Sequence, residues 1–311
     1  MSTMFSADAA IERRPIMITG ASGFVGWNAT RYFALRRHDV IATFGSFPHY
    51  LHDDDDVRTV QMDLLDDTSV ERVVSHFQPR CILHCAALAH PQRDKDETLL
   101  MRVNVDGAEA VARHAARYHI PIVYLSTDLV YPLQAGKVTA SSTVDPSTPY
   151  GRSKLLGEQA VTASNDSWVV IRPSIMYGAG TTRSNSFSQF LDRCWEKGEE
   201  APVFADQFRS FLSVRDLVSA VEVLISREEE WGHVFLCGGP ERLSRHQFAL
   251  RYARIKGIDD RLIRSMRAQD LEGYVGGASD IELDSDPLLK LGWNQHSIEE
   301  SISEMHTIPL R

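Results

Sequence analysis

Short apolar runs alternate with longer amphipathic segments through the first half of the chain. Five runs have the length of buried strands, at residues 15–19, 40–44, 59–62, 81–85 and 120–125. Three segments between them carry apolar residues at helical spacing, at 27–37, 68–77 and 99–118. This alternation predicts an α/β fold whose parallel strands form a doubly wound Rossmann-type sheet with helices on both faces.

The second half of the chain is less regular. The pattern predicts a helix at 150–161, a strand at 168–172 that stops at Pro173, and helices at 187–197 and 217–225. We therefore expect a flexible N-terminus (1–14) and an NAD(P)-binding Rossmann domain at 15–172, to which a segment at about 210–236 returns. Residues 173–209 and 237–311 are expected to form a smaller substrate-binding lobe.

The composition excludes several classes of partner. The 33 Lys and Arg residues against 42 Asp and Glu give a formal charge of −9, which argues against nucleic acid or an anionic membrane as the main partner. No stretch approaches about 18 apolar residues, so no membrane span is expected. The four cysteines form no CxxC pair, which favours a cytoplasmic protein without a metal site. His84 and Cys85, on a predicted strand, are expected to be core residues.

A glycine-rich loop follows the first predicted strand directly. Gly20 permits a tight turn, Gly23 lets the backbone approach a pyrophosphate, and Gly26 permits close packing of the next helix. The helix N-terminus that follows offers unpaired N–H groups to phosphates. The order of strand, loop and helix predicts a dinucleotide site.

The end of the second strand bears on the choice of dinucleotide. An NAD site usually has a carboxylate there for the ribose hydroxyls, whereas this chain has the uncharged segment 43–46. Ser46 could donate a hydrogen bond to a 2′-phosphate. NADP(H) is therefore favoured over NAD(H), although no arginine stands beside Ser46.

A second set of polar residues has the chemistry of proton transfer. Tyr150 and Lys154 are four residues apart and share one face of a predicted helix. A nearby ammonium lowers the pKa of a phenol, which prepares Tyr150 to exchange a proton with a hydroxyl or carbonyl. Thr127 ends the preceding strand, at the sheet edge where such folds bind ligands, and is expected to orient the substrate oxygen.

The chain resembles the extended short-chain dehydrogenase/reductases along nearly its whole length. The resemblance is carried in order by TGASGFVG, DLLD, HCAA, RVNVDG, STDLVY, YGRSK and RPSIMYG. It implies catalysis by Thr127, Tyr150 and Lys154, with Lys154 also on the nicotinamide ribose. It further implies a cofactor set, in which Ala86 and Ala87 could instead serve only close packing: Gly20, Ser22, Gly23, Phe24, Val25, Gly26, Ser46, Asp63, Leu64, Ala86, Ala87, Asn104, Tyr150, Lys154 and Pro173.

Within the family, STDLVYP and PYGRSKLLGE are most similar to dTDP-4-dehydrorhamnose reductases and to the beta subunit of methionine adenosyltransferase. The segment RSFLSVRD implies that Arg209 grips a nucleotide diphosphate, the alternative being a surface arginine, and Asp128 is assigned to the substrate. Two departures affect substrate positions: Gly276–Gly277 replace an Arg-Pro pair, and Ile175–Met176 stand where a tryptophan is typical. Leu129 replaces the glutamate that dehydratases use as a base, which argues against dehydration.

Three functions remain open from the sequence. The first is an NAD(P)H-dependent oxidoreductase that reduces a keto group of a nucleotide sugar or similar polyhydroxylated substrate. The second is an NAD-dependent nucleotide-sugar epimerase, and the third is a cofactor-binding regulatory subunit. The family also implies a homodimer formed through the helices at 99–118 and 150–161.

Overall fold

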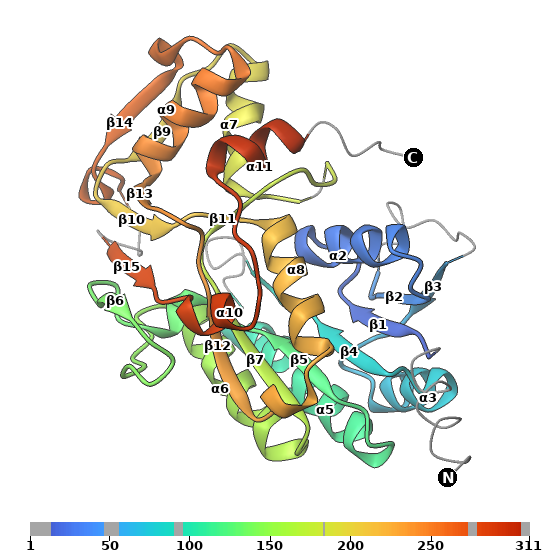
Figure 1. Cartoon of the computed structure of the whole chain (residues 1–311). Helices are drawn as coiled ribbons and strands as arrows, with labels where there is room; N and C mark the ends of the chain where they lie inside the picture. The colour runs from blue at the N-terminus through green and yellow to red at the C-terminus, as the bar shows by residue number, and fades with distance from the viewer. Residues whose placement is uncertain (1–13, 47–55, 90–95, 183, 273–278, 306–311) are drawn as a thin grey trace. The chain divides into compact units, whose positions relative to one another are not determined.

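The chain folds into two compact units. The computed structural model describes residues 14–46, 56–89, 96–182, 184–272 and 279–305. Unit 1 combines the described parts of 1–126 with 153–170 and 224–233, and unit 2 combines 127–152 and 171–223 with the described parts of 234–311. The helix and strand labels are those of Figure 1.

The largest sheet has seven strands in the order β12-β7-β5-β4-β1-β2-β3 (Figure 1). The pairs β1–β2, β2–β3, β1–β4 and β4–β5 are parallel. Strand order reverses between β1 and β4, which is the arrangement of a doubly wound fold, so the predicted fold class is confirmed. The strands are β1 (Ile16–Thr19), β2 (Val40–Phe44), β3 (Val57–Gln61), β4 (Cys81–His84), β5 (Ile122–Leu125), β7 (Trp168–Pro173) and β12 (His233–Cys237).

The central strands form where the sequence has unbroken apolar runs. Every residue of β1, β4 and β5 is buried, because both faces of a parallel sheet are covered. The predicted strands agree with these bounds to within two residues. Pro173 is the last residue of β7, whereas it was expected to follow the strand.

The helices of unit 1 differ from prediction mainly at their starts and in continuity. Helix α2 (Phe24–Leu35) begins directly after Gly23, and α3 (Asp67–Phe77) begins at the Asp66 cap. The predicted helix at 99–118 is interrupted: α4 (Glu97–Met101) leads into a π-helical turn (Arg102–Asp106) and then α5 (Gly107–Arg117). The π-helical turn contains Asn104, the residue of this segment that was assigned to the cofactor. Helix α6 (Pro149–Ser164) begins in unit 2 and continues into unit 1.

Unit 2 contains a mixed four-stranded sheet in the order β13-β10-β15-β6. Strand β10 (Gln207–Ser210) is antiparallel to β13 (Arg242–Ser244) and parallel to β15 (Ser279–Leu283), which is parallel to β6 (Gly136–Val138). Two short pairs accompany it, β8 (Met176–Tyr177) with β11 (Leu212–Ser213) and β9 (Ala201–Phe204) with β14 (Ile263–Met266). The remaining helices are α7 (Phe187–Glu196), α8 (Val214–Ile225), α9 (Arg245–Lys256), α10 (Asp286–Lys290) and α11 (Ile298–Glu304).

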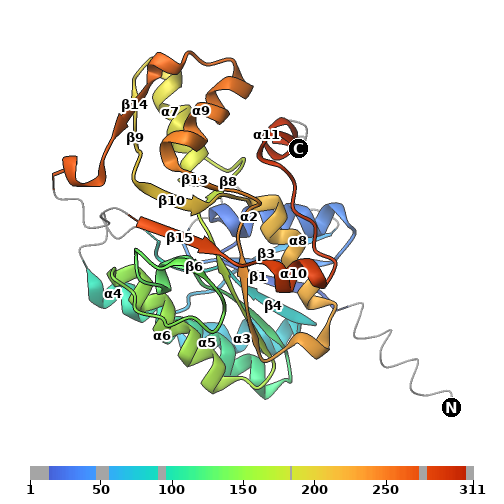
Figure 2. The same cartoon turned by 60° about the vertical axis from the view of Figure 1, so that its left-hand side comes forward.

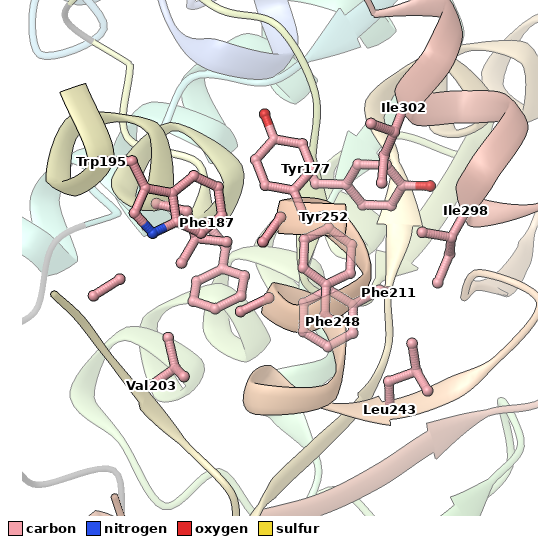
Figure 3. Close-up of a cluster of buried hydrophobic side chains, with 14 residues drawn as sticks. Tyr177, Phe187, Trp195, Val203, Phe211, Leu243, Phe248, Tyr252, Ile298 and Ile302 are labelled. Atoms are coloured by element: carbon pink, nitrogen blue, oxygen red, sulfur yellow. The ribbon is translucent and has the colours of Figure 1, made fainter. Parts of the chain in front are cut away.

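A hydrophobic cluster of unit 2 is rich in aromatic side chains (Figure 3). Helices α7 and α9 lie side by side next to β9 and β14 (Figures 1 and 2). Phe248 of α9 stacks on Phe211 with ring centroids 4.3 Å apart, and Trp195 of α7 stacks on Tyr252 of α9 at 5.6 Å. The sequence pattern did not predict α9, although its Ser244–Gln247 capping box is a local signal for a helix start.

Candidate functional site

The glycine loop of unit 1 packs so closely that side chains are excluded from it. Gly20 has φ +64°, and a Cβ atom added there would lie 2.6 Å from the Ala86 Cα. A Cβ atom on Gly26 would lie 2.3 Å from the Gly20 carbonyl oxygen, and one on Gly23 would lie 3.2 Å from the same oxygen. The first turn of α2 is thereby brought against the backbone after β1, and a pyrophosphate fits such a turn at a helix N-terminus.

Substitution of Gly26 by alanine is expected to abolish dinucleotide binding. The new Cβ atom would overlap backbone atoms of the loop, which cannot yield as a flexible side chain would. Isothermal titration with NADPH and NADH, together with thermal unfolding, checks this expectation. The control is Gly45→Ala, because a Cβ atom there meets no described atom within 4 Å and should leave the folding unchanged. Unimpaired nucleotide binding by Gly26→Ala would contradict the expectation.

The other predicted cofactor residues of unit 1 follow the strand ends. Ala86, after β4, packs on the glycine loop and donates its N–H to Thr19 Oγ1 (3.2 Å). Asp63, after β3, is exposed and accepts a hydrogen bond from the Leu65 N–H (2.9 Å). Ser46 is exposed after β2. Ser22 lies in the turn before α2, and Phe24 and Val25 are the first two residues of that helix. Leu64 and Ala87 are half-buried after their strands.

Asn104 clamps the segment after β4. Its Oδ1 accepts from the Leu88 N–H (2.8 Å), and its Nδ2 donates to the Leu88 carbonyl (3.0 Å) and to Ser153 Oγ (2.9 Å). Asn104 is buried in the π-helical turn, so these bonds tie that turn to the loop after β4 and to α6. Asn104, which was assigned to the cofactor, therefore holds the backbone at Leu88 and the side chain of Ser153 in place through its own side chain.

Lys154 lies in a row of buried polar and aromatic side chains in unit 1. Its Nζ is 4.0 Å from the ring centroid of Tyr124, and Tyr124 stacks on His84 with centroids 5.7 Å apart. His84 Nδ1 is hydrogen-bonded to Thr19 Oγ1 at 2.9 Å. The Lys154 ammonium has no hydrogen-bond partner within the described part of the chain.

Burial determines the acid–base properties of this row. It lowers the pKa of Lys154 to about 7, an effect that the nearby Glu158 carboxylate opposes. It lowers the pKa of His84 to about 3, with repulsion from Lys154 as a smaller cause, and raises that of Cys85 to about 12. His84 is thus a neutral core residue, as predicted. Cys85 is a protonated thiol at neutral pH and no nucleophile.

Folding stability is expected to decrease as the pH falls from 6.5 towards 3. Folded His84 stays neutral down to about pH 3, while the unfolded chain binds a proton near pH 6.5, so the unfolded state takes up more protons in this window. The linkage amounts to about 2 kcal/mol between pH 7.5 and 5.0. Urea unfolding at both pH values should show this difference in the wild type and a smaller one in His84→Gln. The exposed His76→Gln is the matched control. If His84→Gln showed the same difference in unfolding free energy between the two pH values as the wild type, the linkage would be refuted.

Unit 2 contains the predicted substrate residues as one buried cluster. Asp128 Oδ2 lies 3.2 Å from Arg209 Nε and accepts from Ser174 Oγ at 3.1 Å. Thr127 Oγ1 donates weakly to Asp128 Oδ1 at 3.4 Å. Burial raises the pKa of Asp128, and Arg209 and these hydroxyls oppose the shift. Pro173, which was assigned to the cofactor, is buried at the end of β7 next to Ser174.

Arg209 is not a surface arginine, and most of its guanidinium donors already have partners. It is buried, and its Nη1 donates to Ser279 Oγ (2.7 Å) and to the Phe208 carbonyl (2.9 Å) while Nε faces Asp128. Only Nη2 has no hydrogen bond within the described residues. The surface alternative is wrong, because the fold buries the start of this segment in the β10–β15 pair. Gly276–Gly277 lie outside the described residues.

Tyr150 lies one helical turn before Lys154 on α6. The pKa of its phenol was expected to be lowered by Lys154, which is wrong: burial raises this pKa, and the Asp128 carboxylate raises it further. A Cβ atom on Gly151 would lie 2.2 Å from the Leu129 carbonyl, and one on Gly157 would lie 2.2 Å from Tyr124 Oη. The two glycines let α6 pack closely at both turns. The sequence pattern predicts no specific role for them, although glycines within a helix are a sequence signal for such contact.

The described residues contain neither a candidate metal site nor a membrane-spanning helix. No group of three or more His, Cys, Asp or Glu side chains among them could hold a metal ion. No helix among the described residues is long and apolar enough to cross a membrane.

Comparison with known proteins places these features in a family. The family described as the RmlD substrate binding domain matches residues 13–286. Methionine adenosyltransferase 2 subunit beta of Xenopus laevis is 25% identical over 93% of this chain and 86% of its own. The dTDP-4-dehydrorhamnose reductase of Mycobacterium tuberculosis is 28% identical over 67% of this chain and 65% of its own. The crystal structure of dTDP-4-dehydrorhamnose reductase from Bacillus anthracis, in complex with NADP, is similar with a TM-score of 0.78 and 23% sequence identity. The match covers 95% of this chain and 99% of the reductase chain.

Proposed function

Because this chain belongs to the RmlD substrate binding domain family, we propose that it is a nicotinamide-dependent reductase of a keto group on a nucleotide-linked sugar. The observation that carries the proposal is α6, which bears a phenol and a buried ammonium one turn apart. The dTDP-4-dehydrorhamnose reductases among the relatives support the substrate class. We also propose that the protein is a homodimer and that it is cytoplasmic.

The glycine loop fits a dinucleotide, because a Cβ atom at Gly20 or Gly26 would fill the turn. We assign the pyrophosphate to this loop and to the first turn of α2, and the nicotinamide ribose to the Lys154 ammonium, which makes no hydrogen bond to the described residues. Residues 15–172 with about 210–236 would hold the cofactor, and residues 173–209 and 237–311 the substrate. When bound, the reduced nicotinamide supplies the hydride. NADPH is proposed over NADH, because no carboxylate stands at 43–46 after β2.

The protein's own residues supply the proton and the orientation. Tyr150 is protonated at neutral pH, since burial and Asp128 raise its pKa, and it donates the proton to the keto oxygen as negative charge develops there. Thr127 donates a hydrogen bond to the same oxygen. Lys154, one turn further on α6, stabilises the resulting phenolate. The open Nη2 of Arg209 is proposed to bind a phosphate oxygen, and Asp128 a sugar hydroxyl.

A second function is suggested by one of the relatives. Methionine adenosyltransferase 2 subunit beta aligns with 93% of this chain. A regulatory subunit of that kind would bind a catalytic partner chain and would not require turnover at Tyr150.

An NADPH oxidation assay with dTDP-4-dehydrorhamnose tests the reductase proposal. We expect one NADPH consumed per keto group, with the alcohol identified by mass spectrometry. No consumption, together with stoichiometric capture of a methionine adenosyltransferase catalytic chain, would favour the regulatory function. Tightly retained NAD⁺, with isomerisation of a nucleotide sugar and no net oxidation, would favour the epimerase.

A further inference from the structure

A buried carboxylate lies one helical turn beyond Lys154. Glu158 is 5% exposed, and the Ser126 hydroxyl at the end of β5 donates a hydrogen bond to its Oε1. Ser126 is itself buried and directly precedes Thr127. A buried carboxylate is unfavourable unless it is hydrogen-bonded or balanced by a positive charge, so a role for Glu158 is to be expected. The proton transfer described above uses neither Glu158 nor Ser126.

Lys154 needs an anionic neighbour for the same reason. Its side chain is 2% exposed, and Tyr124 meets it with an aromatic face, which attracts an ammonium but does not neutralise it. His84 on β4 is neutral and cannot balance the charge.

Two other titratable groups bear on the charge near Lys154: Cys85, which acts on the ammonium, and Tyr150, which lies on the same helix. Cys85 follows β4, but burial raises its pKa to about 12, so it carries no charge at neutral pH. Tyr150, one turn earlier on α6, is a protonated phenol because its pKa is raised. Glu158 is therefore the one anionic group that acts on Lys154 among the residues the structure describes.

We propose that Glu158 is a positioning residue that keeps Lys154 protonated in its buried site, and that Ser126 holds the Glu158 carboxylate in the orientation this requires. The inference rests on the proposed function, because in that function the positive charge of Lys154 stabilises the Tyr150 phenolate. It also links the end of β5, where Thr127 follows, to the helix that carries Tyr150 and Lys154. Loss of the carboxylate would release the proton of Lys154 at lower pH.

The titration of Lys154 tests this directly and without turnover. Protein labelled with ¹³C at lysine Cε is titrated by NMR, and the Lys154 resonance is identified by its absence in Lys154→Met. Glu158→Gln keeps the shape and an acceptor for Ser126 but removes the charge, and should lower the Lys154 pKa by about one unit. The exposed Glu109→Gln is the matched control and should leave the titration unchanged. An unshifted Lys154 in Glu158→Gln overturns the proposal.

Ser126→Ala examines the anchor and covers the case in which Glu158→Gln does not fold. It keeps the Glu158 charge and should shift the Lys154 titration in the same direction by less than Glu158→Gln; an unchanged titration overturns the role of Ser126. In active protein, Glu158→Gln should shift the alkaline limb of the kcat/KM profile to lower pH by about one unit as well. If wild-type protein reduces no keto sugar, the proposed function fails while the NMR result still decides the role of Glu158.

Discussion

Tyr150→Phe is expected to lower kcat for reduction of the keto sugar by about 10²–10⁴-fold, the usual contribution of a positioned general acid. The variant keeps the ring and loses only the hydroxyl that would donate the proton. Because the proposed contacts to the cofactor are made by the glycine loop and Lys154, NADPH affinity should stay within about twofold of the wild type. Stopped-flow turnover and fluorescence titration measure the two quantities separately.

The matched control for this substitution is Tyr118→Phe, a half-buried tyrosine at the end of α5. It should keep wild-type turnover and affinity. The pH dependence of kcat gives a further check. Because the pKa of Tyr150 is raised, the phenol stays protonated through the neutral range, and its ionisation should not limit kcat there. Retention of full kcat in Tyr150→Phe would mean that another group donates the proton.

Lys154→Met should lower kcat/KM by about 10²–10³-fold, as expected for removal of one preorganised electrostatic contact to the reacting groups. It differs from Tyr150→Phe in its effect on the cofactor. The ammonium has no hydrogen-bond partner within the described residues and is proposed to bind the ribose, so NADPH affinity should fall together with kcat. Folding should be largely retained, because methionine fills the same space against Tyr124.

Circular dichroism and NADPH titration of Lys154→Met separate these effects. Lys197→Met, at an exposed position after α7, is the control and should leave both NADPH affinity and turnover unchanged. A Lys154→Met protein that binds NADPH like the wild type would remove the ribose contact from the mechanism. Only its electrostatic effect on Tyr150 would then remain.

The strands of the Rossmann-type sheet were predictable because their signal is local. A parallel strand covered on both faces must be apolar throughout, so β1, β2 and β4 stand out from the sequence alone. The glycine loop is equally local, since a turn with φ +64° at Gly20 restricts the residue type at that position itself.

The late elements were less predictable because their apolar residues are few and interspersed with charges. Helix α9 has five basic or histidine side chains around the buried Phe248, Ala249, Tyr252 and Ala253, so its core-facing stripe is narrow. The π-helical turn around Asn104 was also missed. It leaves the apolar spacing of its helix nearly unchanged, and its side-chain bonds to Leu88 and Ser153 depend on distant segments.

The sequence by itself determined the sheet, the glycine loop and the helical spacing of Tyr150 and Lys154, because each depends on residues within one turn or one strand. Only the tertiary structure decided which partners meet: Arg209 with Asp128, and Ser126 with Glu158. It also decided the burial that brings the pKa of Lys154 to about 7. These properties arise from side chains that are far apart along the chain, and no local periodicity encodes the distance or the dielectric between them.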